Sequence, residues 1–213
     1  MGVPQNHSHP MSGADEGDGR HGADHWSGRP NNVLIDEITG MVPGRAIDLG
    51  CGGGGDAIWL ASQGWTVTGV DISQVAIDGA AKTARERDVD VDWICADFVD
   101  QPPTDGGFDL VTAFYPALLK SAEDDSVNAL LVGVAEGGTL LVVGHGAAVS
   151  KTALSQGFDP GDYMEPEDIA RHLDADWDIE VLGPTRQGSE GSPRNDDIVL
   201  KATRRGLPER HAT

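Results

Sequence analysis

Basic residues are scarce in this chain. Its 213 residues include 15 Lys and Arg against 35 Asp and Glu, a formal charge of −20 at pH 7. Binding to a polyphosphate requires basic patches that neutralise phosphates. The one basic cluster is the C-terminal tail, with Arg204, Arg205 and Arg210, which we interpret as a solvated terminus. We therefore expect no nucleic acid partner.

Cysteines and long apolar runs are also few. Because Cys51 and Cys95 are the only cysteines, we expect no structural disulfide and predict a reducing, cytoplasmic location. The sequence has no apolar run of about 18 residues, the length that a membrane-spanning helix needs. It also lacks the positive start and apolar centre of a signal peptide. No membrane partner is expected.

The first 25 residues contain almost no large apolar side chains, and Gly, His, Asp, Ser and Pro predominate. Such a segment cannot bury enough apolar surface to offset the entropy of ordering. We therefore predict a disordered leader at residues 1–25, one domain at residues 26–204 and a flexible tail at residues 205–213. The leader holds His7, His9, His21 and His25. They lack the fixed spacing of a metal site, so no metal is expected.

The most informative motif is glycine-rich, RAIDLGCGGGGDAIWLA at residues 45–61. It predicts a buried strand that runs into glycines and then into a helix beginning near Asp56. Without Cβ atoms in the way, backbone N–H groups can approach a ligand, and the helix N-terminus adds partial positive charge. Gly50, Gly52 and Gly55 also satisfy the dinucleotide pattern G-x-G-x-x-G, so the loop alone does not identify its ligand.

Two aspartates narrow the choice of ligand. Asp71 closes the next strand, where an acid commonly binds the ribose of a nucleotide and can accept hydrogen bonds from both hydroxyls. Its alternative role is to cap the following helix, which Ser73 can do instead. Asp48 lies two residues before Gly50, where it would repel a pyrophosphate. The Asp48 carboxylate would instead attract an ammonium group. S-adenosylmethionine carries an ammonium group as well as a positively charged sulfonium.

Strands and helices alternate along the rest of the chain. Further strands are predicted at residues 91–95, 109–113 and 139–143. Helices are predicted at residues 32–39, 56–63, 73–88, 122–134 and 166–173. The last two predicted strands, residues 179–182 and 198–202, follow each other without a helix. This succession indicates an α/β fold with an antiparallel strand pair at one edge of the sheet.

Five sequence blocks resemble the class I S-adenosylmethionine-dependent methyltransferases. They are AIDLGCGGG (46–54), VTGVDIS (67–73), ICADF (94–98), FDLVTAF (108–114) and GGTLLVVG (137–144). Two further segments, WSGRPNNVL (26–34) and DAIWLASQGW (56–65), are similar to the small bacterial tellurite-resistance and thiopurine methyltransferase group. The resemblance implies a Rossmann-like, doubly wound, mostly parallel seven-stranded sheet with an antiparallel C-terminal strand pair.

The resemblance also implies S-adenosyl-L-methionine as the cofactor. The residues implied to bind it are Asp48, Gly50, Gly52, Gly54, Asp71, Ile72, Asp97, Phe98 and Ala113. The glycines would let the backbone pass under the methionine part of the cofactor. Asp97 would face the adenine amino group, with Ile72 and Phe98 against the ring, and Ala113 would present its backbone near the cofactor's amino group. A loop role for Asp97 and core packing for Ile72 are the alternatives.

Tyr115 and His145 are the candidate catalytic residues, because each follows a strand at the edge where open α/β sheets bind ligands. His145 can act as a general base, or it can simply bond a neighbouring backbone group. Trp26 and Arg29 lie in a segment that resembles an N-terminal lid, which would exclude water from the reaction. Surface packing of Trp26 and a solvated Arg29 are the alternatives. Cys51 has no evident base beside it, which favours a structural role.

These features predict methyl transfer to a small-molecule acceptor through an S-, O- or N-nucleophile, with the protein supplying alignment and desolvation. A thiol or another soft anion needs no strong base, whereas an O- or N-acceptor would make His145 or Tyr115 more important. One alternative is a non-catalytic S-adenosylmethionine-binding protein or partner subunit. Another is a nicotinamide-dependent oxidoreductase, which leaves Asp48 and Asp97 unexplained. We expect a monomer or a homodimer.

Overall fold

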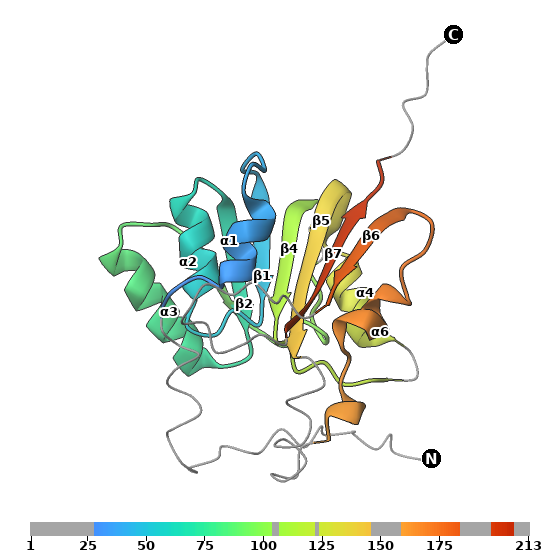
Figure 1. Cartoon of the computed structure of the whole chain (residues 1–213). Coiled ribbons are helices and arrows are strands. Elements are labelled where there is room, and N and C mark those ends of the chain that lie inside the picture. The colour runs from blue at the N-terminus through green and yellow to red at the C-terminus, as the bar shows by residue number, and fades with distance from the viewer. Residues whose placement is uncertain (1–27, 104–106, 122–123, 146–158, 184–196, 207–213) are drawn as a thin grey trace, which may run out of the picture.

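The computed structural model describes residues 28–103, 107–121, 124–145, 159–183 and 197–206. The predicted leader, most of the predicted tail and Trp26 lie outside the described residues. The described part forms three layers, with a central sheet between two sets of helices (Figure 1). None of the helices in these ranges has the length and apolar character needed to cross a bilayer.

The central layer is a seven-stranded sheet with the order β3-β2-β1-β4-β5-β7-β6. Its strands are β1 (Arg45–Leu49), β2 (Thr66–Asp71), β3 (Asp92–Cys95), β4 (Phe108–Phe114), β5 (Val134–His145), β6 (Trp177–Leu182) and β7 (Asp197–Arg204). Strands β1 to β5 pair in parallel, whereas β7 runs antiparallel to both β5 and β6. The predicted mixed sheet with an antiparallel C-terminal pair is confirmed.

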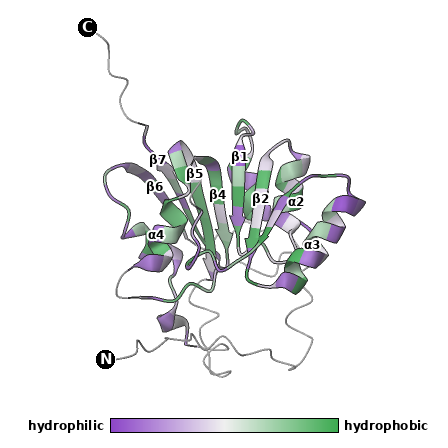
Figure 2. Cartoon of the chain, turned by 180° about the vertical axis from the view of Figure 1, so that it is seen from behind, coloured by the Kyte–Doolittle hydropathy of each residue, from purple (hydrophilic) through white to green (hydrophobic). Residues whose placement is uncertain are grey.

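Helices cover both faces of the sheet and bury a separate apolar cluster on each (Figure 1). The helices are α1 (Asn32–Ile38), α2 (Gly55–Ser62), α3 (Gln74–Glu86), α4 (Asp125–Leu131) and α6 (Pro166–Ala170), with a 3-10 turn, η1, at Pro160–Asp162. Leu34 and Leu60 pack on one face, and Leu130 and Ile169 on the other. Figure 2 shows hydrophilic and hydrophobic stretches alternating along the helices, as expected where one side of each helix packs on a sheet.

Side-chain caps begin the first and third helices where the sequence predicts. The Asn31 side chain accepts a hydrogen bond from Val33 N at 2.9 Å, and the Ser73 hydroxyl accepts one from Ala76 N at 3.3 Å. Each cap satisfies one of the backbone N–H groups that a helix start leaves without a partner. Ser73 therefore performs the capping role that was the alternative for Asp71.

The largest difference from the predicted elements is around α4. A helix was predicted over residues 122–134, but α4 ends at Leu131 and β5 begins at Val134. The Gly133 carbonyl accepts a hydrogen bond from Phe108 N at 2.9 Å, which draws the chain into the sheet at that point. Strand β5 then extends to His145, well beyond the predicted residues 139–143. This pairing joins residues far apart in sequence, so a local apolar pattern does not reveal it.

Because β1 to β5 are parallel, their carboxyl ends meet at a single edge of the sheet, and the antiparallel β7 begins at that edge. Ligands of open α/β sheets bind outside the carboxyl ends of the strands. The glycine loop, Tyr115, His145 and the first residue of β7 all belong to this edge.

Candidate active site

The glycine loop follows β1 and is held against the end of β2. The backbone N–H groups of Gly50 and Cys51 both donate to Val70 O, at 2.8 and 2.9 Å. Gly50 and Gly52 have φ angles of +75° and +51°, a region that suits glycine. A Cβ on either would meet no atom of the described residues within 4 Å. The loop therefore presents bare backbone to open space, as close approach of a ligand requires.

Gly54 has a different environment, facing the protein interior. A Cβ there would lie 2.6 Å from the Trp93 ring and 2.8 Å from the Ala80 Cβ, and Gly54 is also the residue that precedes α2, with φ +74°. Its missing side chain lets the loop pack tightly against α3 and β3. This packing role was not visible in the sequence, because Trp93 lies 39 positions away (93 minus 54).

Asp71 lies beside the loop at the end of β2. Its Oδ2 accepts a hydrogen bond from Gly52 N, and its Oδ1 accepts one from Ser73 N, both at 2.8 Å. A carboxylate offers about four acceptor positions, so two remain for a pair of hydroxyl donors. Its neighbour Ile72 is 52% exposed. A carboxylate with spare acceptors next to an exposed apolar side chain fits a nucleoside.

The other residues assigned to the cofactor differ in accessibility. Asp97 is half-buried, and its Oδ1 accepts a hydrogen bond from Val99 N at 2.9 Å. Phe98 packs against the apolar cluster of the α4 and α6 face. Ala113 is completely buried in β4, so the accessible residues at that strand end are Phe114 and Tyr115. Cofactor contacts of Asp97, Phe98 and Ala113 remain predictions.

Asp48 lies beneath the loop and is buried, with 3% of its surface exposed to solvent. Its Oδ1 accepts a hydrogen bond from the Thr112 hydroxyl at 2.8 Å. Burial, together with the nearby Asp56 carboxylate, raises the pKa of Asp48 to about 7. Burial also raises the pKa of Asp56, against the lowering effect of its hydrogen bond from Asn31 N. A cationic ligand group in front of the loop would stabilise the ionised forms of both acids.

We predict that these buried acids make the unliganded protein more stable at mildly acidic pH than at pH 8. Between about pH 4, the ordinary pKa of aspartate, and about pH 7, the folded protein keeps a proton that the unfolded chain has lost. The folded state then binds more protons, so the free energy of unfolding falls as pH rises. From the Asp48 shift, the fall should be on the order of 4 kcal/mol.

Thermal or urea unfolding of Asp48→Asn between pH 4.5 and 8 measures this effect. The variant lacks the ionisable group, so its stability should vary less with pH than that of the wild type. Asp36→Asn, on the exposed side of α1, serves as the matched control and should keep the wild-type dependence. Equal pH dependence in Asp48→Asn and the wild type would contradict the assignment.

Three residues meet at the carboxyl edge: Tyr115 just after β4, His145 at the end of β5 and Asp197 at the start of β7. The rings of Tyr115 and His145 stack, with centroids 4.4 Å apart and an interplanar angle of 25°. The Tyr115 hydroxyl donates to Asp197 Oδ2 at 2.7 Å, and Asp197 Oδ1 lies 4.0 Å from His145 Nδ1. Tyr115 has φ +52°, and its N–H donates to Val143 O at 2.7 Å. The two predicted catalytic residues are therefore neighbours, with a carboxylate facing both.

Asp197 is the functional candidate that the sequence did not reveal. It is separated from Tyr115 by 82 positions and comes directly after residues 184–196, which the structure does not describe. The register of β5 and β7 places Asp197 opposite His145. The sequence does show an acidic residue at the start of the last strand. Its proximity to His145 follows only from the register of that strand with β5.

The segment before α1 crosses the start of α2. Arg29 O lies so close to Gly55 that a Cβ on this glycine would be 2.7 Å away, and Asn31 N donates to Asp56 Oδ1 at 2.6 Å. The segment thus borders the glycine loop, and the substrate role of the exposed Arg29 stays a prediction. Burial and the nearby Asp48 raise the pKa of the Cys51 thiol, which favours the uncharged thiol and the structural interpretation.

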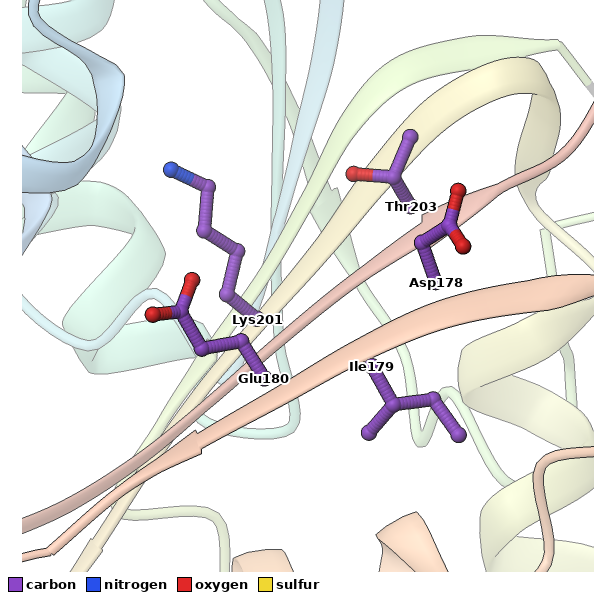
Figure 3. Close-up of a pocket in the computed structure, with 5 residues that line it drawn as sticks. All are labelled: Asp178, Ile179, Glu180, Lys201 and Thr203. Atoms are coloured by element: carbon purple, nitrogen blue, oxygen red, sulfur yellow. The ribbon is translucent and has the colours of Figure 1, made fainter.

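A surface depression on β6 and β7 is lined by Asp178, Ile179, Glu180, Lys201 and Thr203 (Figure 3). Lys201 Nζ binds Glu37 of α1 through the backbone O at 2.9 Å and Oε2 at 3.1 Å. In the β6–β7 register, Asp178 pairs with Thr203, near the end of β7 farther from Asp197. The depression therefore does not belong to the edge that holds the glycine loop.

Comparison with known proteins agrees with this geometry. Residues 46–136 match the family model described as "Methyltransferase domain". The chain is 28% identical over 180 residues to 2-heptyl-1-hydroxyquinolin-4(1H)-one methyltransferase of Mycobacteroides abscessus, covering 80% of this chain and 76% of that one. A segment of 41 residues is 46% identical to ribosomal RNA small subunit methyltransferase C of Alcanivorax borkumensis, covering 19% of this chain and 13% of that enzyme.

Solved structures share the fold. The magnesium protoporphyrin IX methyltransferase of Synechocystis, solved with bound SAH, is 24% identical with a TM-score of 0.61, covering 81% of this chain and 80% of that one. TehB from Haemophilus influenzae is 17% identical with a TM-score of 0.60, covering 82% and 62%. The chain therefore carries a methyltransferase domain over residues 46–136, and its fold is that of the S-adenosylmethionine-dependent methyltransferases of class I. Its cofactor is S-adenosylmethionine, which the open glycine loop and Asp71 fit.

Proposed function

We propose that this protein methylates a hydroxyl oxygen of a small molecule, with S-adenosylmethionine as the methyl donor. The observation that carries the proposal is the cluster of Tyr115, His145 and Asp197 at the carboxyl edge. A relative that matches most of this chain is named for a hydroxyquinolone substrate, which supports an acceptor of this kind.

The cofactor supplies a methyl group bound to a positively charged sulfur. A neutral hydroxyl is a weak nucleophile, and removing its proton as it reacts speeds the reaction by a factor of about 10²–10⁴. The His145 side chain is 37% exposed at the end of β5, so it is within reach of an acceptor at this edge. It takes the hydroxyl proton, while the protein aligns the acceptor and excludes water.

The polar cluster favours a hydroxyl over a thiol acceptor. A thiol has an ordinary pKa of about 8.5 and ionises readily near neutral pH, so it needs no strong base. A phenol or N-hydroxyl compound gains more from a neighbouring imidazole. The Tyr115–His145 stack also presents aromatic surface, against which a flat acceptor can pack.

The test is a methyl-transfer assay with the purified full chain. Matched acceptors would carry a hydroxyl, a thiol or an amine on the same aromatic ring, and mass spectrometry would locate the added methyl group. We expect O-methylation with formation of S-adenosylhomocysteine, and thermal protection by S-adenosylhomocysteine but not by NAD. Methylation of the thiol alone would contradict the proposal, and so would cofactor binding without transfer to any acceptor.

A further inference from the structure

We propose that Asp197 is a positioning residue that holds Tyr115 and His145 together and determines which imidazole nitrogen is basic. This inference rests on the proposed function, because it concerns the base that the reaction would use. It assigns a role to a residue of β7 that lies outside the sequence blocks shared with the methyltransferases.

Asp197 has a defined place in the sheet. It is the first residue of β7, lies opposite His145 in the ladder with β5, and is 9% exposed. A buried carboxylate is costly unless it is hydrogen-bonded. The Tyr115 hydroxyl at 2.7 Å provides such a bond, and hydrogen bonds to a charged acceptor are stronger than those between neutral groups. The Tyr115 ring is thereby anchored at its far end.

The second oxygen of Asp197 acts on His145. Oδ1 lies 4.0 Å from Nδ1, which is beyond a hydrogen bond but close enough for an electrostatic effect. A negative charge on this side of the ring favours a proton on Nδ1, and Nε2 is then the basic nitrogen. The stacked Tyr115 ring limits rotation of the imidazole. Together these two contacts favour one orientation and one tautomer of the histidine.

During the reaction the acceptor O–H bond breaks and its electron pair stays on the oxygen. The proton moves to His145 Nε2, and the Asp197 carboxylate stabilises the resulting imidazolium without taking the proton. Within the described part of the chain, three titratable groups face the end of β5: Tyr115 after β4, Asp197 of β7 and Glu165 before α6, whose Oε2 lies near Gly144. Among these described groups, it is the Asp197 carboxylate that lies 4.0 Å from the imidazole Nδ1.

The decisive experiment is ¹⁵N NMR titration of the histidines in the unliganded protein, with His145 assigned by comparison with His145→Ala. In Asp197→Asn, which keeps the size of the side chain, the pKa of His145 should fall by about 0.5–1 unit because an opposite charge is lost. The proportion of the Nδ1–H tautomer should fall as well. Glu180→Gln, on the exposed side of β6, is the control and should change neither.

Tyr115→Phe provides a second variant. It removes the bond to Asp197 but keeps the stacked ring and the carboxylate, so His145 should keep its preference for the Nδ1–H tautomer. In the methyl-transfer assay, Asp197→Asn should lower kcat about tenfold and leave the KM for S-adenosylmethionine within about twofold. An unchanged pKa and tautomer of His145 in folded Asp197→Asn would overturn the inference. Those shifts without O-methylation by the wild type would uphold the positioning role and refute the proposed function.

Discussion

His145→Ala should lower the turnover of a hydroxyl acceptor by a factor on the order of 10²–10⁴, while the affinity for S-adenosylmethionine changes little. The imidazole lies at the end of β5 beside Tyr115 and Asp197, whereas the glycine loop follows β1 and Asp71 ends β2. Removal of the base should therefore affect the chemical step and leave cofactor binding intact.

The pH dependence of turnover should follow the ionisation of the His145 imidazole. The neutral imidazole is the active form, so turnover should fall as the medium is acidified through the range in which histidine gains a proton, ~6.5 in the ordinary case. With a thiol acceptor, His145→Ala should lower turnover less than about tenfold. The pH profile of turnover should then follow ionisation of the acceptor thiol near ~8.5. Both profiles can be measured from pH 5 to 9 at saturating cofactor.

The matched control is His172→Ala. His172 contacts Asp168 and Asp124 near α6 and α4, away from the glycine loop, so its replacement should leave turnover within about twofold. Wild-type turnover of a hydroxyl acceptor by His145→Ala would reject the base role and leave alignment alone to account for catalysis.

The second large effect is expected at Asp71. Asp71→Ala should weaken binding of S-adenosylmethionine and S-adenosylhomocysteine by roughly 10- to 100-fold. The assigned role predicts the loss of two hydrogen bonds from the ribose hydroxyls to a charged acceptor, each worth about 1.5–3 kcal/mol before water compensates. The substitution also removes the Oδ2 acceptor of Gly52 N, so part of the loss should come from a less ordered loop.

Isothermal titration calorimetry with S-adenosylhomocysteine gives the affinity directly. Asp78→Ala, an exposed position on α3, removes a carboxylate of the same type and should bind with wild-type affinity. If Asp71→Ala is folded and binds as tightly as the wild type, the ribose assignment is wrong.

Local patterns accounted for most of the individual elements. The strand before Gly50 is a short apolar run, and the helix after Ser73 has a capping side chain and one apolar face, with Ala76, Ile77, Ala80 and Ala84 buried. The residues that specify each of these elements lie within a few positions of one another, so the element can be predicted from the local sequence. The extent of α4 and β5 depended on pairing between Phe108 and Gly133, which no local pattern contains.

The cofactor side of the site was more predictable than the catalytic side. The loop glycines form one short segment after β1, and Asp71 ends β2, the next strand along the chain and the parallel partner of β1. The structure places the Asp71 carboxylate against this loop, where its Oδ2 accepts a hydrogen bond from Gly52 N. The contact between Tyr115 and Asp197 instead joins residues that are far apart in the sequence, and so does the close packing of Gly54 with Trp93. Such contacts exist only once the strand order and register are established.

The sequence by itself determined the class of fold and the cofactor, and it predicted the edge of the sheet at which ligands bind. It could do so because a buried parallel strand, a glycine turn and an acid at a strand end are local features with few structural alternatives. Tertiary structure alone decided that Tyr115 and His145 stack and that Asp197 faces both. The antiparallel return of β7 brings that carboxylate to the carboxyl edge, and the side chain is held there because a buried charge needs a hydrogen-bonding partner.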